Sequence, residues 1–257
     1  MIDAFTHLDL SCTDPIGDME ACMAGAGIQY ALAVETWKGD NLPWLHRMME
    51  SGRSQFRLVE CFRPAQTESY PDMLQNPAVV GLRVRTAEIP CLQDVASALR
   101  FCGKWLVPHA ESGIGPAAKT LLKVVERTPG LQIYVPHLGW PVQDKAEDPE
   151  WEGAMAALWQ IPRLVVGISA IPHFSRRPFP HTDVEEYAER LREVFGPGRL
   201  VAASDYPLME KGRYTDYMHL AEQWIRRAHP GAASDFERDI AGEVAATQPG
   251  ERGIEIE

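Results

Sequence analysis

The chain has 257 residues, of which 45% are hydrophobic, and a formal net charge of −11 at neutral pH. This length is enough for one large α/β domain with a sizeable core. The negative charge argues against nucleic acid and anionic membranes as partners, because both bind basic surfaces. No apolar stretch approaches the roughly 20 residues of a membrane span, and no signal peptide precedes the first predicted strand. We therefore expect a cytoplasmic protein with a small-molecule substrate, and the sequence leaves a homo-oligomer open.

The five cysteines include no Cys-x-x-Cys pair. An odd number without such a pair favours reduced, mostly buried thiols over a disulfide framework or a zinc knot. This composition fits the same cytoplasmic expectation.

Short apolar runs alternate with helical patterns along the chain. The predicted strands cover residues 1–5, 30–34, 56–61, 79–84, 105–107, 131–135, 164–168 and 200–203. The predicted helices cover residues 16–26, 42–50, 69–75, 92–101, 115–126, 149–159, 183–195, 214–228 and 235–244. Asp14 with Pro15 predicts the start of the first helix and Gly27 its end, while Asp183 is the predicted cap of the helix that it opens. Continuous apolar strands suit a sheet that is buried on both faces.

Eight strand–helix units in about 250 residues predict a single-domain (β/α)8 barrel, of the TIM type, over residues 1–257. The polar segment 247–257 is expected to fray. The alternative is an open doubly wound sheet, which would need a glycine-rich phosphate turn after its first strand. Thr6-His7-Leu8-Asp9-Leu10 stands there instead, so the barrel is favoured.

Four predicted strands run into residues of metal-ligand or acid/base type: His7, His109, His137 and Asp205. The carboxyl ends of barrel strands form the active site. His7, His109 and Asp205 would suit Zn²⁺ or a similar cation with a position left for water, which would then lose its proton near neutral pH. His137 could move a proton or polarise a carbonyl. The alternative is that each residue is structural, with Asp205 capping the next turn.

Arg83 and Arg85 have the same parity, so both point to one side of their strand. They are candidates for a clamp on a substrate carboxylate, or for a salt bridge to Glu60 or Glu111.

Two further alternatives stay open at the strand ends. Glu35 and Glu60 either support the histidines or are rim charges, and Trp37, Trp140 and Tyr206 either line a pocket or pack in the core. Ser169 and His173 end the seventh strand, and the proline-rich loop from His173 to His181 is either a lid or an ordinary connection.

Three segments resemble strand motifs of the amidohydrolase superfamily. They are Ile2-Asp3-Ala4-Phe5-Thr6-His7-Leu8, Val135-Pro136-His137-Leu138-Gly139-Trp140-Pro141 and Ala203-Ser204-Asp205-Tyr206-Pro207, and they are similar to its first, sixth and eighth strands. Val80-Gly81-Leu82-Arg83 is similar to the fourth-strand motif. The resemblance is closest to amidohydrolase family 2, which includes aminocarboxymuconate-semialdehyde decarboxylase-like and pyrone-dicarboxylate lactonase-like enzymes. It covers nearly the whole chain.

The resemblance implies a distorted (β/α)8 barrel with, usually, one divalent metal, for which zinc is the first candidate. His7 and His109 would then be metal ligands, Asp205 a ligand or the base that activates water, and His137 the acid/base or carbonyl-polarising residue. The family's first strand ends in His-x-His, but Phe5 stands at the first of these positions, and phenylalanine cannot bind a cation. At most three ligands remain.

Arg83 and Arg85 stand where a carboxylatable lysine would bridge two metals, so a two-metal site is not expected. Some lactonases of this branch work without metal, using an aspartate to activate water and histidines and arginines to polarise the substrate. The sequence therefore predicts a hydrolase of a small carboxylate-bearing lactone, ester or amide that uses water activated by Asp205, with or without a metal. The alternatives are a non-oxidative decarboxylase and a catalytically degenerate barrel that binds a small molecule.

Overall fold

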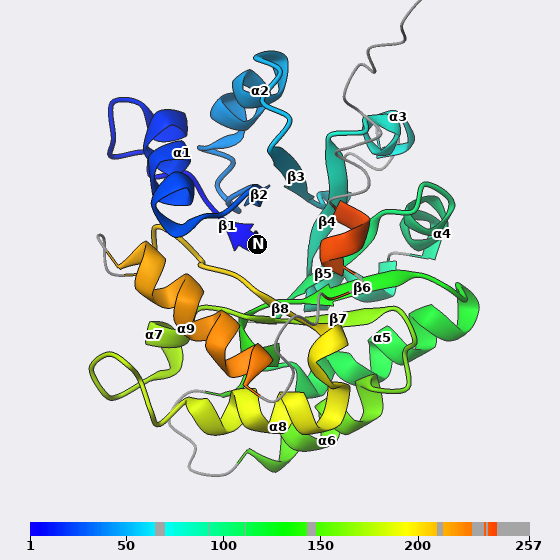
Figure 1. Cartoon of the computed structure of the whole chain (residues 1–257). Helices are drawn as coiled ribbons and strands as arrows, with labels where there is room; N and C mark the ends of the chain where they lie inside the picture. The colour runs from blue at the N-terminus through cyan, green and yellow to red at the C-terminus, as the bar shows by residue number, and fades with distance from the viewer. Residues whose placement is uncertain are drawn as a thin grey trace, which may run out of the picture.

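The computed structural model describes residues 1–64, 70–91, 93–110, 112–142, 148–209, 213–227, 234 and 236–240. Its eight strands form one sheet in the order of the sequence, and the helices surround that sheet (Figure 1). Every consecutive strand pair is parallel. The predicted (β/α)8 barrel is confirmed.

The strands are β1 (Ile2–Thr6), β2 (Tyr30–Val34), β3 (Phe56–Cys61), β4 (Val79–Arg85), β5 (Trp105–His109), β6 (Gln132–Val135), β7 (Leu164–Ile168) and β8 (Leu200–Ala202). The barrel closes between the chain that follows β8 and the end of β1. The backbone N–H of Asp205 donates to the carbonyl of Phe5 over 2.8 Å, and the N–H of His7 donates to the carbonyl of Tyr206 over 2.7 Å. The segment that carries Asp205 is therefore part of the seam of the barrel.

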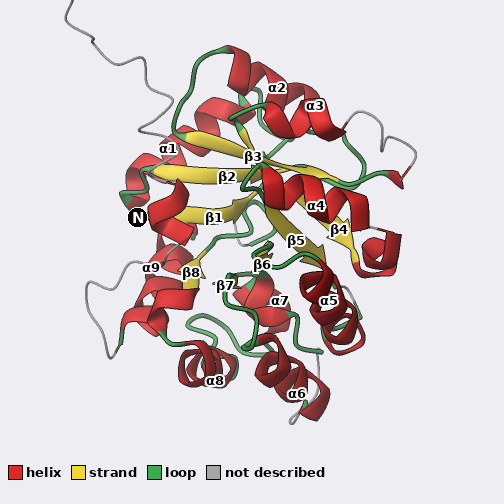
Figure 2. Cartoon of the chain, turned by 90° about the vertical axis from the view of Figure 1, so that its right-hand side faces the viewer, coloured by secondary structure: helices red, strands yellow, loops and turns green. Residues whose placement is uncertain are grey.

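The helices are α1 (Pro15–Ala26), α2 (Leu42–Glu50), α3 (Tyr70–Gln75), α4 (Gln93–Phe101), α5 (Gly115–Arg127), α6 (Pro149–Leu158), α7 (Ile171–Phe174), α8 (Glu185–Phe195) and α9 (Tyr214–Arg226), with residues 236–240 also helical. Figure 2 shows α1 to α6, α8 and α9 arranged around the strands. Short 3-10 turns at η2 (Thr86–Cys91), η3 (His137–Gly139) and η4 (Pro197–Arg199), and α7 itself, were not predicted. Of the predicted elements, residues 69, 92, 228, 235, 241–244 and the tail 247–257 lie outside the described residues.

Local sequence signals explain the start of α1 but not that of α8. The carboxylate of Asp14 accepts from the N–H of Gly17, and Gly27 ends the helix in the left-handed region at φ 68°. α8 begins at Glu185, so the prediction that Asp183 caps it is wrong. The Asp183 carboxylate instead accepts from the hydroxyl and backbone donors of the preceding loop, at Ser175 and Arg176.

The interior of the barrel is closed at the amino ends of its strands. Phe236, which is fully buried, packs against Trp105 at 4.7 Å and Tyr134 at 4.9 Å between ring centroids. Trp105 is the first residue of β5, so this contact fills the lower end of the barrel. The opposite end, where the strands finish, is left for the predicted polar residues. Within the described part of the chain, no helix is both long and apolar enough to cross a membrane.

Candidate active site

The four predicted strand-end residues are buried together at the carboxyl end of the barrel. The ring of Phe5 packs edge-on against His7 at 5.3 Å and against His137 at 4.5 Å. The indole of Trp140 packs against both His137 and His109, at 4.7 and 4.8 Å. Asp205 joins this group through its backbone bond to Phe5. The structure thus brings the predicted residues together, while their chemical roles remain predictions.

Arg83, on β4, lies in the middle of this group. Its Nη2 is 2.9 Å from Nδ1 of His109, and its guanidinium lies over the rings of Phe5 at 5.2 Å and Trp37 at 5.0 Å. A guanidinium can only donate, so Nδ1 of His109 must accept and the ring proton is placed on Nε2. His109 therefore offers the site an N–H donor.

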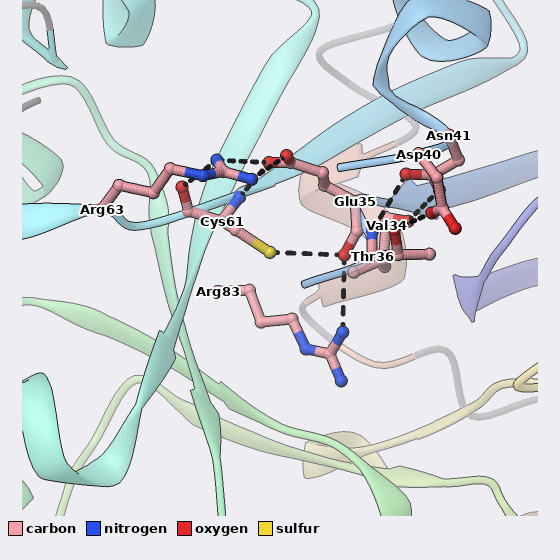
Figure 3. Close-up of polar contacts among 8 residues, drawn as sticks. All are labelled: Val34, Glu35, Thr36, Asp40, Asn41, Cys61, Arg63 and Arg83. Carbon is pink, nitrogen blue, oxygen red and sulfur yellow. Dashed lines mark hydrogen bonds and ion pairs between the residues drawn. The ribbon is translucent and has the colours of Figure 1, made fainter. Parts of the chain in front are cut away.

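Glu35 fixes Arg83 from the end of β2 (Figure 3). Its backbone carbonyl accepts from Nη1 of Arg83 over 3.4 Å and from the Cys61 thiol over 3.4 Å. Its buried carboxylate accepts from the backbone N–H of Cys61 over 2.6 Å and forms an ion pair with Arg63. Glu35 is thus neither a partner of the histidines nor a rim charge, because its charge is paired with Arg63.

His7, which follows β1, is oriented by the last peptide of the neighbouring strand β2. Its Nδ1 lies 2.7 Å from the carbonyl oxygen of Val34, which also accepts from Nδ2 of Asn41 over 2.9 Å. Since a carbonyl can only accept, the His7 proton is on Nδ1 and Nε2 carries a lone pair. Burial, helped by the charge of Arg83, lowers the pKa of His7 to about 3, so the ring is neutral.

His137 begins a left-handed turn. His137, Leu138, Gly139 and Trp140 have φ values of 58°, 54°, 72° and 55°. The Ser169 hydroxyl lies 3.0 Å from both the backbone nitrogen and Nδ1 of His137 and thereby fixes the ring. Burial, together with Arg83, lowers the pKa of His137 well below its ordinary value, so this ring is neutral too.

Asp205 is a buried carboxylate in the left-handed region, at φ 59°. Burial raises its pKa from 3.8 to about 7; the charge of Arg83 opposes this shift, and that of Asp3 adds to it. A carboxylate with a pKa near neutral is well matched to general base catalysis. It borders a cavity of about 160 Å³ that is also lined by Ala170, Pro172, His173, Ser204, Leu208 and Met209.

The remaining candidates lie around this centre. Arg85 is exposed and stacks on Trp37 at 4.3 Å, whereas Arg83 is buried in the site.

His173 lines the cavity, but His181 is buried away from it, with Nε2 2.9 Å from the Tyr217 hydroxyl. The loop between them is thus anchored at its far end, and a role as a lid stays a prediction. Glu60 lies beside Glu35, and Glu111 falls outside the described residues.

The predicted metal ligands are tested by their arrangement. His7, His109 and Asp205 do not place three ligand atoms within 4.8 Å of one another; among the described residues, Asp9, Cys12 and Asp18 do. Nδ1 of His109 faces a guanidinium, so Nε2 carries a proton that a metal ligand cannot keep. Phe5 adds an apolar ring where another donor would be needed. The predicted donor set, as arranged, does not fit a divalent cation.

Sequence reasoning missed the group formed by Asp9, Cys12 and Asp18. The Asp9 carboxylate accepts from the backbone and hydroxyl of Ser11 and from the Cys12 thiol. The Tyr206 hydroxyl donates to Asp18. These contacts hold the loop after β1 against the seam of the barrel, and they account for the two carboxylates without an ion.

Comparison with known proteins identifies a family over the second half of the chain. Residues 118–239 match the family described as amidohydrolase. No curated protein matches the sequence significantly. A zinc-bound amidohydrolase from Burkholderia multivorans is 14% identical, with 95% of this chain and 97% of that protein covered at a TM-score of 0.72.

Two further solved structures come from differently named enzymes. A protein from Pseudomonas putida assigned as a 2-pyrone-4,6-dicarboxylic acid hydrolase is 18% identical, covers 94% and 97% of the two chains, and has a TM-score of 0.68. The 2,6-dihydroxybenzoate decarboxylase from Rhizobium is 11% identical over 93% and 97%, with a TM-score of 0.59. These neighbours show the same fold. The family match over residues 118–239 bears out the amidohydrolase resemblance of the sixth- and eighth-strand motifs, which lie inside that range.

Proposed function

We propose that this amidohydrolase-like chain is a hydrolase of small carboxylate-bearing lactones or esters, in which Asp205 activates the attacking water without a metal ion. The observation that carries the proposal is the contact between Arg83 and His109, 2.9 Å long. This contact puts a fixed positive charge in the site and makes His109 a donor. Both properties serve an anionic substrate with a carbonyl group, because a guanidinium pairs with carboxylates and an N–H donor polarises a carbonyl oxygen.

The proposed chemistry needs one base and one donor. Asp205, ionised above a pKa of about 7, takes a proton from water as the water oxygen adds to the acyl carbon. The N–H of His109 supports the acyl oxygen as it gains negative charge. When the tetrahedral intermediate collapses, the carbon–oxygen bond to the leaving group breaks and the proton held by Asp205 passes to that oxygen. One water is consumed, and the product is one acid and one alcohol from an ester or one hydroxy acid from a lactone.

Amides fit this site less well than lactones and esters. An amine leaving group must be protonated before it departs, and the proton taken up by Asp205 is the only one that the proposed chemistry supplies for this step, because burial and Arg83 keep His7 and His137 neutral. The zinc that one structural neighbour binds belongs to that protein; here the predicted ligands are opposed by Arg83 and Phe5. A decarboxylase remains the alternative within the same fold, and a binding protein that has lost its chemistry remains the alternative outside catalysis.

The test is turnover by metal-stripped protein on a panel of lactones, esters and aromatic acids, with elemental analysis of the same sample. Each ester or lactone is paired with an analogue that lacks the free carboxylate. We expect hydrolysis of the carboxylate-bearing members at a rate that does not rise when zinc is added back. A strict zinc requirement would contradict the proposal, and release of carbon dioxide from the aromatic acids alone would support the decarboxylase. Binding without turnover would support the non-catalytic barrel.

A further inference from the structure

We propose that Trp140 is a further catalytic residue, whose indole N–H donates to the substrate's acyl oxygen as that oxygen becomes negatively charged. The inference rests on the proposed hydrolytic function. It adds a second neutral donor to the one supplied by His109, so that the two rings together form an oxyanion site.

The Trp140 indole is buried with its polar atom unused. The residue is 8% exposed, and its Nε1 has no hydrogen-bond partner among the residues that the structure describes. A buried donor that is left unpaired destabilises the folded state, because it has lost its hydrogen bond to water. Native proteins rarely accept that cost unless a ligand, a water or the reaction supplies the partner.

The position of the ring points to the reaction. The indole packs edge to face against His109, at 4.8 Å and 89°, and against His137, at 4.7 Å and 87°. His109 holds its proton on Nε2, because Arg83 occupies Nδ1. Two neutral N–H donors therefore belong to rings in direct contact. Neutral donors that are fixed in a dry site stabilise developing negative charge without any reorganisation.

The backbone that presents Trp140 is strained. Three non-glycine residues, His137, Leu138 and Trp140, share the left-handed region with Gly139, and this region is unfavourable for a residue with a Cβ atom. The turn is held by the bond from the Trp140 N–H to the His137 carbonyl, 2.8 Å, and by the bond from Trp151 Nε1 to the Leu138 carbonyl, 3.0 Å. Such strain is typical of functional sites, and here it brings the rings of His137 and Trp140 into contact.

The other indoles near the site have different surroundings. Trp151 uses its Nε1 to hold the turn, so its role is structural. The Nε1 of Trp37 also lacks a partner within the described residues, but Trp37 is half-buried and lies beneath the guanidinium groups of Arg83 and Arg85. Trp37 therefore packs against the two arginines, whereas Trp140 packs against His109 and His137.

The experiment follows the indole N–H signals of the seven tryptophans by ¹H–¹⁵N NMR. The probe is 3-phosphonopropionate, because its carboxylate suits Arg83 and its tetrahedral phosphonate resembles the charged intermediate; succinate is the planar analogue. Trp140→Phe assigns the signal of interest. We expect that signal to move downfield, and to move further with the phosphonate than with succinate. Trp140→Phe should bind the phosphonate about tenfold more weakly, since a hydrogen bond to a charged group is lost.

Trp159→Phe is the matched control, because Trp159 is 53% exposed on the outer side of the barrel, just after α6. Its signal and the affinity of its variant should not change. A Trp140 signal that stays in place with both probes, or a folded Trp140→Phe protein that binds the phosphonate as tightly as the parent, overturns the inference. If Trp140→Phe does not fold, the other tryptophan variants assign the signal by elimination and the titration of the parent decides.

Turnover separates this inference from the proposed function. Hydrolysis of the lactone panel by a protein whose Trp140 signal does not respond would overturn the role of Trp140 and leave the proposed function intact. A responding Trp140 signal without any hydrolysis would support the donor and contradict the proposed function.

Discussion

The carboxylate of Asp3 accepts hydrogen bonds from both the backbone N–H and the hydroxyl of Ser204, over 2.8 and 2.6 Å. The Tyr214 hydroxyl donates to the same carboxylate over 2.9 Å, and the Ser204 hydroxyl accepts from the N–H of Tyr206 over 2.9 Å. These bonds fix the chain on both sides of Asp205 to the first strand. The same buried carboxylate therefore closes the barrel and places the candidate base.

Asp3→Asn is expected to lower the free energy of unfolding by on the order of 2 kcal/mol. The amide replaces one acceptor oxygen with a donor, so at least one buried donor at Ser204 or Tyr214 is left unpaired, at a cost of about 1–3 kcal/mol. Denaturant unfolding measures the change. Asp94→Asn is the control, because Asp94 is exposed on α4 and its loss should change stability by less than about 0.5 kcal/mol. Equal stability of the parent and Asp3→Asn would contradict this account of the seam.

Arg83→Lys is expected to reduce kcat/KM roughly 10- to 100-fold on a carboxylate-bearing substrate. Lysine cannot span Glu35, His109 and a substrate carboxylate at once, because it lacks the planar fork of arginine. Arg85→Lys is the matched variant: Arg85 is exposed and stacks on Trp37, so its effect should be below about threefold. Steady-state kinetics on the same substrate measure both. A larger loss of kcat/KM in Arg85→Lys than in Arg83→Lys would show that Arg85, and not Arg83, binds the substrate carboxylate.

Much of the fold could be predicted because its signals are local. Apolar runs of strand length alternate with helical patterns, and the polar residue after a strand meets its counterparts wherever parallel strands end together. The convergence of His7, His109, His137 and Asp205 follows from this rule. The parity of Arg83 and Arg85 predicted that both point to one side of their strand, and both guanidiniums lie over the ring of Trp37.

The contacts that decide the chemistry could not be predicted, because they depend on three-dimensional pairing. Asp3 and Ser204 are 201 positions apart, and no periodicity links them. The pairing of Arg83 with His109 depends on the register of β4 and β5, and the pairing of Glu35 with Arg63 on side-chain directions at two strand ends. Asp183 shows the opposite error. The local sequence predicted a helix cap, but the Asp183 carboxylate accepts hydrogen bonds from donors in its own loop instead.

Phe5→His alone is expected to leave zinc binding weak, whereas Phe5→His combined with Arg83→Met should strengthen it about tenfold or more. The Phe5 ring contacts His7 and His137, so a histidine there would face the site. The guanidinium of Arg83 would still occupy Nδ1 of His109 and repel a cation, until it is removed. Calorimetric titration with zinc measures each protein. Tight binding by the single variant would show that Arg83 does not oppose a metal.

Asp205→Asn is expected to lower kcat/KM by about 10²–10⁴-fold, the usual contribution of a general base. In the parent, the rate should rise with pH and reach half its maximum at the pKa of Asp205, about 7, because the carboxylate must be ionised to accept a proton. A pH–rate profile on a hydrolysed member of the panel tests both statements. A folded Asp205→Asn protein with near-normal turnover would return Asp205 to a structural role.

The same substitution is expected to change how stability depends on pH. Burial raises the pKa of Asp205 from 3.8 to about 7, so between these values the folded chain holds a proton that the unfolded chain has released. Stability must therefore fall as the pH rises through this window. Asp205→Asn removes the cost of the buried charge, and well above pH 7 the variant should be more stable than the parent by on the order of 4 kcal/mol, which is the shift of about three pKa units converted to free energy. Near pH 4 the two proteins should differ little.

Asp3, whose pKa burial raises to about 6, titrates in the same direction in both proteins. Both proteins should therefore keep a common fall of stability with pH that is due to Asp3. Denaturant unfolding at the two ends of the window measures the difference, and a difference that is the same at both ends would mean that Asp205 is ionised as readily in the folded chain as in the unfolded one.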